Sequence, residues 1–599
     1  MFNNLTKSIE IGDMKLKNRM VQPAMGTNLA GADGTVSDSI VDYYTRRAEG
    51  GVGLIITEVC CPEPGGRVIP GELEASRHAF IPGLNRLATA AHAGGAKIAL
   101  QLAHGGCFAS ESVTGERPIT PSGKGTVQLP EEDPKKMTVE EIEELIEAYG
   151  QAAQRGKMAN FDAIELHGAH GYMPLQFLSR YTNKRTDKYG GSLRDRARFA
   201  LETIKCIKEY TGDDFPLIYR LSVKEDVPEG VTLEEALQFA QWAQAAGVDA
   251  IHVSVGTWDS RMHNYQKVLQ GEESPEGKDL SEGICTGMWV PPLYVSRGNL
   301  VDLAAAVKEN VDIPIIGVGG LSPEIGDEII EEEKADLAAM GRQIIADPDY
   351  PQKVKENKPE EIRRCVRCNE CLYRAVSYRG VKCAVNPEAG QEHEEFVELN
   401  SPSQKRKIMV VGSGPAGMAA AYTAAKRGHE VNIYEKEAEL GGLLRYLSAP
   451  DFKKDYKDFM EWQISELKRK GVNIIKETEV DAKLVKKENP DKIIVATGGK
   501  SVSLDESICN QDCYNAMDVL SGEIPEENKV LVCGAGLAGS EVAMYLAEDY
   551  DKEVVLIDQL SEIVPAVGPF TQMVIKSRLI EDGVEIKTDH CIEEINCDG

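Results

Sequence analysis

Residues 407–436 read KIMVVGSGPAGMAAAYTAAKRGHEVNIYEK. An apolar run leads into the turn Gly412-x-Gly414-x-x-Gly417, a helix-forming segment follows, and a second apolar run ends in Glu435. Glycines at this spacing let backbone N–H groups approach a pyrophosphate at a helix start, while the acid can bind a ribose hydroxyl. The stretch therefore predicts a Rossmann-type dinucleotide site.

A second stretch, residues 529–558, repeats this pattern with KVLVCGAGLAGSEVAMYLAEDYDKEVVLID. Its glycines are Gly534, Gly536 and Gly539, and its second apolar run ends in Asp558. Two fingerprints in tandem predict two dinucleotides, one held tightly and one that exchanges. An acid at Asp558 would repel a 2′-phosphate, so the second site favours NADH over NADPH.

Four cysteines precede the first of these stretches, Cys365, Cys368 and Cys371 at CxxCxxC spacing and then Cys383. Thiolates spaced in this way can close around one cubane 4Fe-4S cluster. A four-cysteine zinc site is the alternative, although such sites more often use two separated CxxC pairs. A disulfide pair is disfavoured, because we expect a reducing compartment.

The composition of the 599 residues is typical of a globular protein of several domains, with 42% apolar and 27% charged residues. No uninterrupted apolar run reaches the ~18 residues of a membrane span, and the first residues lack the pattern of a signal peptide. The net charge of −29 repels nucleic acid and anionic membranes. We therefore expect a cytoplasmic protein with small-molecule partners, no nucleic-acid or membrane partner, and a homo-oligomer as an open alternative to a monomer.

Before residue 345 the chain contains eight short apolar segments that are rich in strand-forming residues. They lie at 19–24, 54–59, 97–102, 162–167, 217–222, 250–255, 313–318 and 336–341. Helical patterns such as 139–158, 194–210 and 233–246 separate most of them. Apolar strands that alternate with helices indicate a parallel sheet covered on both faces. Eight of them predict an α/β fold with an N-terminal (β/α)8 TIM barrel.

Chemistry in such a barrel collects where the strands end. The groups found there are Met25, Glu58, Gln101, His104, His167, His170, Arg220, Trp258, Gly319, Gly320, Gly341 and Arg342. A purely structural barrel would not need this collection. The glycines follow the seventh and eighth strands, where barrels commonly bind phosphate through backbone N–H groups, so we expect a phosphate-bearing cofactor.

The chain resembles the old yellow enzyme superfamily, specifically its large iron–sulfur branch of 2,4-dienoyl-CoA reductase, 2-enoate reductase and trimethylamine dehydrogenase. The resemblance covers essentially the whole chain. It is carried by PAMGTN at 23–28, HGAHGY at 167–172, FLSRYTNKRTDKYGGS at 177–192, GRQIIADP at 341–348 and the four cysteines. It implies FMN in the barrel, FAD at Glu435 and the Gly412 turn, and a 4Fe-4S cluster between the two flavins.

By similarity, the residues around FMN would be Pro23, Ala24, Met25, Gln101, Arg220, Gly320, Gly341 and Arg342. We assign Gly442, in the turn Glu439-Leu-Gly-Gly442, to the FAD site. The expected domains are the FMN barrel at 1–350, the iron–sulfur segment at 351–404, the FAD domain at 405–525 and the NAD(H) domain at 526–599. A linker is expected near 391–405, at the end of the iron–sulfur segment.

Two departures from the superfamily affect these expectations. The dienoyl reductase branch has a histidine after the sixth strand, whereas this chain has Trp258 there and His263 further along, which leaves the substrate class open. The family continues to a Gly-Asp motif and a final helix that complete the FAD site, whereas this sequence stops at Gly599 inside the second Rossmann unit. We therefore expect a truncated C-terminal end or weakened FAD binding.

Members of this superfamily reduce activated C=C bonds, and three residues can be interpreted in that way. His167 and His170 can donate hydrogen bonds to a carbonyl oxygen and stabilise the enolate charge that forms when hydride reaches the β-carbon. Tyr172 can then deliver a proton to the α-carbon as a general acid. The alternatives are a packed loop pair or a metal site for the two histidines, and a core position for Tyr172.

Arg220 is interpreted as a fixed cation that favours the anionic reduced flavin, because a buried arginine needs an anion. Its alternative role is a charge partner for Glu165 or another nearby carboxylate. Gln101 can bind the flavin pyrimidine edge, but it can equally bind loop carbonyls.

The expected function is an NADH-dependent ene-reductase that acts on C=C bonds conjugated to a carbonyl, as in enoates, enoyl-CoAs or 3-ketosteroids. Electrons would pass from NADH to FAD, to the 4Fe-4S cluster, to FMN and to the substrate. The alternatives are an amine dehydrogenase, which predicts an aromatic cage for a cation, the reverse desaturase reaction, and a non-catalytic electron-transfer protein.

Overall fold

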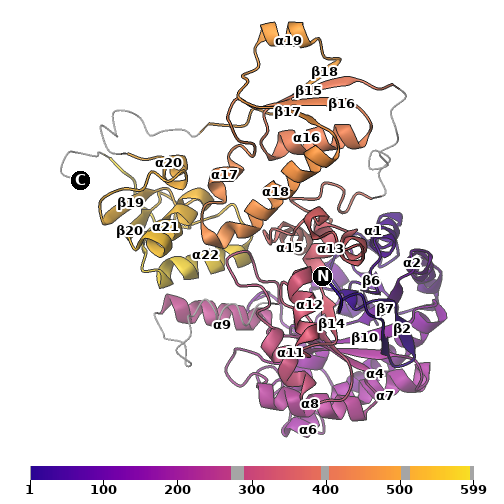
Figure 1. The fold of residues 1–599 in the computed structure, drawn as a ribbon. Helices are drawn as coiled ribbons and strands as arrows, with labels where there is room; N and C mark the ends of the chain where they lie inside the picture. The colour runs from indigo at the N-terminus through magenta and orange to yellow at the C-terminus, as the bar shows by residue number, and fades with distance from the viewer. Residues whose placement is uncertain (1, 271–288, 393–403, 501–512, 594–599) are drawn as a thin grey trace. The chain divides into compact units, whose positions relative to one another are not determined.

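The computed structural model describes residues 2–270, 289–392, 404–500 and 513–593 (Figure 1). Most of the linker predicted at 391–405 therefore lies outside the described residues. The chain divides into two compact units. The first consists of Met1–Pro291, Val295–Pro359 and Cys368–His393, and the second of Pro292–Tyr294, Glu360–Arg367 and Glu394–Gly599.

Eight parallel strands of the first unit close into a barrel, because β14 pairs with β3 and β10 pairs with β7. The strands are β3 (Met20–Gln22), β4 (Leu54–Ile56), β7 (Lys97–Leu102), β10 (Ala163–Gly168), β11 (Leu217–Ser222), β12 (Ala250–Ser254), β13 (Ile315–Gly317) and β14 (Leu337–Ala339). Each lies within or one residue beyond a predicted segment. The predicted TIM barrel is confirmed.

Helices cover the outside of these strands, so the strands are buried on both faces. The longer helices are α1 (Asp38–Glu49), α2 (Ile81–Ala93), α4 (Val139–Met158), α7 (Arg198–Thr211), α8 (Leu233–Ala245), α9 (Trp258–Leu269), α11 (Val301–Lys308) and α12 (Pro323–Glu331). Helix α4 begins with a capping box in which Thr138 accepts from the N–H of Glu141 and the Glu141 carboxylate accepts from the N–H of Thr138. No helix in the described part of the chain is both long and apolar enough to cross a membrane.

Shorter elements complete the first unit. They are β1 (Ile9–Ile11), β2 (Met14–Leu16), β5 (Cys60–Cys61), β6 (Leu73–Glu74), β8 (Ile119–Thr120), β9 (Lys135–Lys136), α3 (Glu111–Thr114), α5 (Met173–Leu178), α6 (Leu193–Arg196), α13 (Gly341–Ala346), α14 (Tyr350–Lys355) and α15 (Glu370–Val376).

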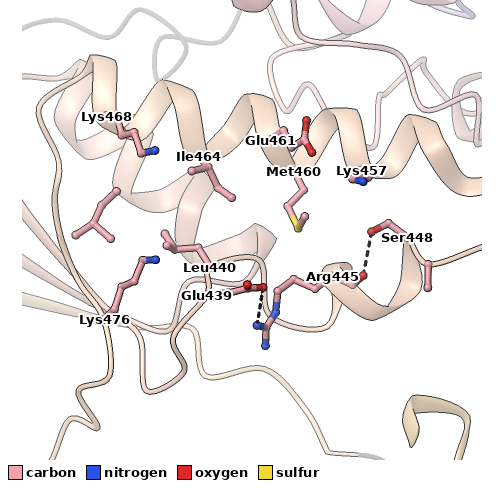
Figure 2. Close-up of a pocket in the computed structure, with 12 residues that line it drawn as sticks. Glu439, Leu440, Arg445, Ser448, Lys457, Met460, Glu461, Ile464, Lys468 and Lys476 are labelled. Atoms are coloured by element: carbon pink, nitrogen blue, oxygen red, sulfur yellow. Dashed lines mark hydrogen bonds and ion pairs between the residues drawn. The ribbon is translucent and has the colours of Figure 1, made fainter. Parts of the chain in front are cut away.

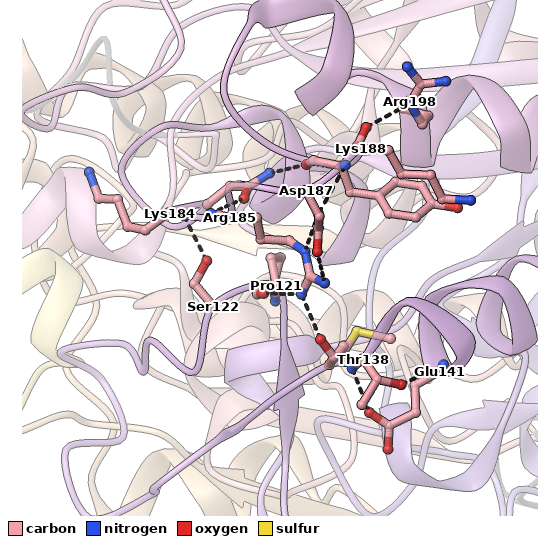
Figure 3. A network of polar contacts seen from close by, with 12 residues as sticks. Pro121, Ser122, Thr138, Glu141, Lys184, Arg185, Asp187, Lys188 and Arg198 are labelled. Carbon is pink, nitrogen blue, oxygen red and sulfur yellow. Dashed lines mark hydrogen bonds and ion pairs between the residues drawn. The ribbon is translucent and has the colours of Figure 1, made fainter.

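The segment that follows α5 is held by one buried arginine (Figure 3). The guanidinium of Arg185 donates to the carbonyls of Pro121 and Met137 at 2.7 and 2.6 Å and to both carboxylate oxygens of Asp187. Asp187 in turn accepts from the N–H of Tyr189 at 3.1 Å. Much of the motif at 177–192 is therefore structural, because it joins two loops to the end of α5, the helix that begins next to Tyr172.

The second unit contains two parallel sheets, each built around one glycine fingerprint. In the first sheet, β17 (Asn473–Ile475), β16 (Glu430–Tyr434), β15 (Lys407–Val411) and β18 (Lys492–Val495) lie in that order. The second sheet has the order β19 (Lys529–Cys533), β20 (Glu553–Ile557) and β21 (Glu585–Lys587). The helices are α16 (Pro415–Lys426), α17 (Leu444–Leu447), α18 (Lys454–Arg469), α19 (Ala482–Glu488), α20 (Ala516–Leu520), α21 (Leu537–Tyr550) and α22 (Pro569–Glu581). Both predicted Rossmann-type units are confirmed.

Candidate functional site

Three side chains gather where β10 ends. His167 belongs to this strand, and Tyr172 is the residue that caps α5. The ring of His167 lies 5.0 Å from the ring of His170 and 4.4 Å from the ring of Tyr172, measured between centroids. The structure therefore brings the three predicted catalytic residues into one cluster.

His170 is held in an unusual position from two sides. Its backbone is left-handed, with φ of 58°, which is uncommon for a residue with a side chain. Its N–H donates to Ser222 Oγ at 3.0 Å, and its Nε2 lies 2.6 Å from Ser254 Oγ. His167 Nδ1, by contrast, is buried without a hydrogen-bond partner. Contacts that fix a strained backbone in this way are common at functional sites.

Burial sets the protonation of the cluster. It lowers the pKa of His167 and of His170 well below the ordinary value, and the cation of Arg220 lowers both further. Burial also raises the pKa of the Tyr172 phenol above its usual range. At neutral pH the cluster therefore holds two neutral imidazoles and one protonated phenol, all of which can donate hydrogen bonds.

Arg220 lies on β11 in register with His167 and has a buried guanidinium. One of its nitrogens donates to the carbonyl of Ala24 at 3.4 Å, and Nε has no partner. It forms no ion pair with any residue that the structure describes. Glu165 favours the cation electrostatically, but its oxygens bind Gln101 and His252 at 2.6 and 2.8 Å. The structure therefore contains no direct ion pair between Arg220 and Glu165, which was one alternative role for Arg220.

Several of the predicted FMN residues lie where the barrel strands end. A Cβ at Gly341 would lie 2.6 Å from Met25 Sδ and 3.0 Å from Pro23 Cγ, so this glycine permits a close approach. Gly320 has a φ of 65° and its carbonyl accepts from Arg297, a cation that no sequence motif indicated. The arrangement fits a phosphate-bearing group, since glycine backbone and a cation lie together.

Arg342 has a different environment from the one expected. Its NH1 donates to the carbonyl of Pro291 and to Asn369 Oδ1, both at 2.6 Å. This nitrogen is used within the protein, so a role in phosphate binding stays a prediction.

An aromatic wall, defined as Trp258 and Trp289, lies beside His170. Trp289 stacks on the His170 ring with centroids 4.5 Å apart, and it meets Trp258 edge to face at 5.6 Å. The guanidinium carbon of Arg261 lies 3.8 Å from the Trp289 centroid and 5.2 Å from that of Trp258. Only Trp258 was selected from the sequence, because it follows a strand. Trp289 and Arg261 belong to segments without a periodic or motif signal.

Each of the two dinucleotide loops contains the same kind of hydrogen bond, from a backbone N–H of the loop to the acid that ends the second strand. Glu435 accepts from the N–H of Ser413 at 3.0 Å, and Asp558 accepts from the N–H of Ala535 at 2.6 Å. Each acid thus binds the residue between the first two glycines of its own fingerprint. Burial raises the pKa of Glu435, but the hydrogen bonds from Ser413 and from backbone N–H groups outweigh it, so the net shift is downward.

The fingerprint glycines leave room for a ligand. A Cβ at Gly414 or Gly536 would meet nothing within 4 Å, whereas one at Gly417 would lie 2.0 Å from the carbonyl oxygen of Gly412. Gly442 approaches Gly414, since its Cβ would lie 3.0 Å from the Gly414 Cα. Open space over one glycine and backbone contact at the others are what a pyrophosphate cradle requires.

A pocket of about 800 Å³ opens between the Glu439–Leu440 turn and α18 (Figure 2). Leu440, Met460, Ile464 and Ile474 supply its apolar surface. Its charged groups are Glu439, Arg445, Lys457, Glu461, Lys468 and Lys476. No sequence motif predicted this pocket apart from the turn at its edge.

The four cysteines are divided between the two compact units. Cys365 belongs to the second unit and is buried, whereas Cys368, Cys371 and Cys383 belong to the first and are half-buried. Among the described residues, no group of three or more His, Cys, Asp or Glu side chains is arranged to hold a metal ion. The donor set of four thiols fits an iron–sulfur cluster in its chemistry, and its geometry stays a prediction.

Comparison with protein families decides between the broad classes. Residues 4–282 and 291–361 match the NADH:flavin oxidoreductase / NADH oxidase family. The chain belongs to this family. Residues 406–599 match the pyridine nucleotide-disulphide oxidoreductase family, so the flavin oxidoreductase barrel is joined to a nucleotide-binding region. The protein is an oxidoreductase of the old yellow enzyme type, as the sequence motifs indicated.

Individual members of the family cover almost the whole chain. The NADH oxidase of Thermoanaerobacter brockii is 40% identical over 99% of this chain and 88% of its own length. The cinnamate reductase of Clostridium sporogenes is 34% identical over 94% of this chain and 84% of its own length. The structure of a 2-naphthoyl-CoA reductase superimposes with a TM-score of 0.92 at 31% identity, covering 100% of this chain and 89% of that one.

Glu58 is a buried acid beside the loop that follows β3. One carboxylate oxygen accepts from the N–H of Thr27 at 2.8 Å and from its hydroxyl, and the other oxygen is buried without a partner. Burial raises the pKa of Glu58 to about 8, although the hydrogen bonds from Thr27 oppose the shift. The folded protein therefore holds this carboxyl protonated at pH 7.

We expect Glu58→Gln to change how stability depends on pH. The folded pKa of about 8 lies above the ordinary value of 4.5, so the native carboxyl stabilises the fold fully below pH 4.5 and loses this contribution as pH rises to 8. Glutamine does not titrate. Between pH 5 and 8 the native protein should lose stability relative to the variant, as measured by thermal unfolding. A constant difference across that range would contradict the assignment.

Proposed function

We propose that this protein is an NADH-dependent flavin and iron–sulfur enzyme that reduces a C=C bond conjugated to a carbonyl group. The observation that carries the proposal is the cluster of His167, His170 and Tyr172 beside Arg220. Two neutral imidazoles, a protonated phenol and a buried cation that forms no ion pair among the described residues suit a reaction in which negative charge develops on oxygen.

The two histidines would bind the carbonyl oxygen of the substrate. Ser254 can donate its hydroxyl proton to His170 Nε2, which would leave the imidazole proton on Nδ1. His167 Nδ1 has no hydrogen-bond partner among the residues that the structure describes, and it would be available to a ligand. Each ring would then supply one N–H to the oxygen that gains charge, and Tyr172 would give its proton to the α-carbon. The flavin, when bound, supplies the hydride for the β-carbon.

The remaining cofactors belong to the same proposal. Glu435 and the Gly412, Gly414, Gly417 and Gly442 backbone would hold FAD, and Asp558 with the second fingerprint would hold NADH. Cys365, Cys368, Cys371 and Cys383 would hold a 4Fe-4S cluster. The domain limits near 350, 404 and 525 are part of this assignment.

The aromatic wall helps to separate the ene-reductase from an amine dehydrogenase. An amine dehydrogenase needs aromatic faces that are open to a cationic substrate. Here Arg261 already lies on the faces of both tryptophans, and burial lowers its pKa only to about 9, so it is a cation at pH 7. A second cation would be repelled. A planar, uncharged aryl group beside Trp258 and Trp289 is favoured instead, and a cinnamate reductase and a naphthoyl-CoA reductase are relatives.

The test of the proposal is anaerobic stopped-flow kinetics. The protein is reduced with NADH and then mixed with cinnamate, crotonate, an enoyl-CoA or a 3-ketosteroid, and the oxidised protein is mixed separately with trimethylamine. We expect flavin reoxidation by an unsaturated carbonyl compound, with the aryl enoate fastest, and no flavin reduction by trimethylamine. Failure of every unsaturated carbonyl compound to reoxidise the flavin would remove the proposal. Oxidation of a saturated product with net flavin reduction would assign the desaturase direction.

Analysis of the purified protein for metals tests the cluster separately. We expect four iron and four acid-labile sulfide per chain, because four thiolates are the ligand set of one cubane. Stoichiometric zinc without sulfide would assign the structural alternative.

Tyr172→Phe tests the general acid. The phenyl ring keeps the packing against His167 but cannot give a proton. Turnover with the best acceptor should fall by ~10²–10⁴, the usual range for loss of a general acid, while flavin reduction by NADH stays unchanged. Unchanged turnover would exclude Tyr172 from proton transfer.

A further inference from the structure

Glu165 is the centre of a polar row that crosses the interior of the barrel. It lies in the middle of β10 and its side chain is fully buried. One carboxylate oxygen accepts from Gln101 Nε2 of β7 at 2.6 Å, and the other binds His252 Nδ1 of β12 at 2.8 Å. Neither the predicted reaction nor the cofactor assignments use this carboxylate, yet one of its two partners is a predicted flavin ligand.

The carboxylate is ionised and therefore accepts at both oxygens. Burial raises the pKa of Glu165, but His252, Arg220 and Gln101 together lower it below its ordinary value. An ionised carboxylate has no proton to donate, so both neighbours must donate to it. His252 must carry its proton on Nδ1, and Gln101 must turn its NH₂ group toward Glu165.

This contact determines which end of Gln101 points away from Glu165. The amide nitrogen is committed to the carboxylate, so the amide oxygen is on the other side. The pyrimidine edge of a flavin has one N–H donor, N3, which needs an acceptor. An amide turned the other way would set a donor against that donor, which leaves both unsatisfied.

We propose that Glu165 is a positioning residue for the flavin, since its carboxylate orients the Gln101 amide so that the oxygen accepts from flavin N3. This inference rests on the proposed function, because it requires FMN in the barrel. His252 has the supporting role of holding the other carboxylate oxygen, and its own Nε2 has no partner. Arg220 acts on the flavin separately, since it makes no direct contact with Glu165.

Two substitutions of Glu165 distinguish the orientation of the Gln101 amide from the effect of the carboxylate charge. Glu165→Met has a similar length and no acceptor, so the Gln101 amide is released. Glu165→Gln also removes the charge but keeps an oxygen that can accept from Gln101, while its NH₂ group donates to His252 Nδ1 after the imidazole proton moves to Nε2. Each is made in the native protein and in Gln101→Leu, and FMN is titrated into the deflavinated proteins by fluorescence quenching.

We expect Glu165→Met to raise the FMN dissociation constant by about tenfold, the upper range for one neutral hydrogen bond, and Glu165→Gln to stay near the native value. Both should have no further effect in Gln101→Leu. Equal weakening by the two substitutions would assign the effect to charge and overturn the proposal. An unchanged constant in Glu165→Met, or the same loss with Leu at position 101, would overturn it as well.

Thermal unfolding of the deflavinated proteins checks that the fold is retained. If Glu165→Met does not fold, His252→Leu replaces it, because loss of the second donor frees the carboxylate to rotate. It should give a smaller weakening of FMN binding that again disappears in Gln101→Leu, and any other pattern overturns the proposal. Absence of FMN binding by the native chain would remove the proposed function and this inference together. If the substitutions change the FMN dissociation constant as expected but no enone is turned over, only the proposed substrate class would be removed.

Discussion

A buried guanidinium that forms no ion pair with any described residue is the constraint around which the barrel site is organised. Arg220 is buried on β11, and Glu165, the carboxylate that favours its charge, gives both oxygens to other residues. A buried cation is costly unless an anion or strong acceptors compensate it. A flavin that becomes anionic on reduction supplies such a group. Compensation of the buried Arg220 cation is thus a physical reason for this chain to bind a flavin, as the family description indicates.

The same burial also explains the state of the residues that would meet the substrate. Low polarity and the nearby cation keep His167 and His170 neutral, and low polarity keeps Tyr172 protonated although the cation opposes this. A charged imidazole would stabilise an oxyanion more strongly, but it would be repelled by Arg220. Under the proposed function the site would use neutral donors, whose positions must be fixed if they are to stabilise charge without reorganisation. Ser222 and Ser254 fix His170, and the ring contacts fix His167.

The strands and both glycine fingerprints could be predicted because their signals are local. Eight apolar runs became eight barrel strands, and each glycine turn became a strand, loop and helix. The polar row could not be predicted in the same way. Glu165 is one residue of a strand, and its partners lie 64 and 87 positions away in the sequence. Trp289 contacts His170, and Arg261 contacts Trp289, only through the tertiary fold. The left-handed backbone at position 170 could not be predicted, because the residue there is not a glycine.

The exchange of a histidine for Trp258 changes the balance of the site. In the dienoyl reductase branch a histidine follows the sixth strand, whereas here an indole occupies the start of α9 and joins Trp289 beside His170. Indole has a single N–H and no group that titrates near neutral pH, so it cannot relay a proton. Proton delivery would then depend on Tyr172 alone, and the surface gained is flat, aromatic and already next to a cation. Under the proposed function, such a wall would bind the aryl group of a conjugated acceptor, while His167, His170 and Tyr172 would carry out the chemistry.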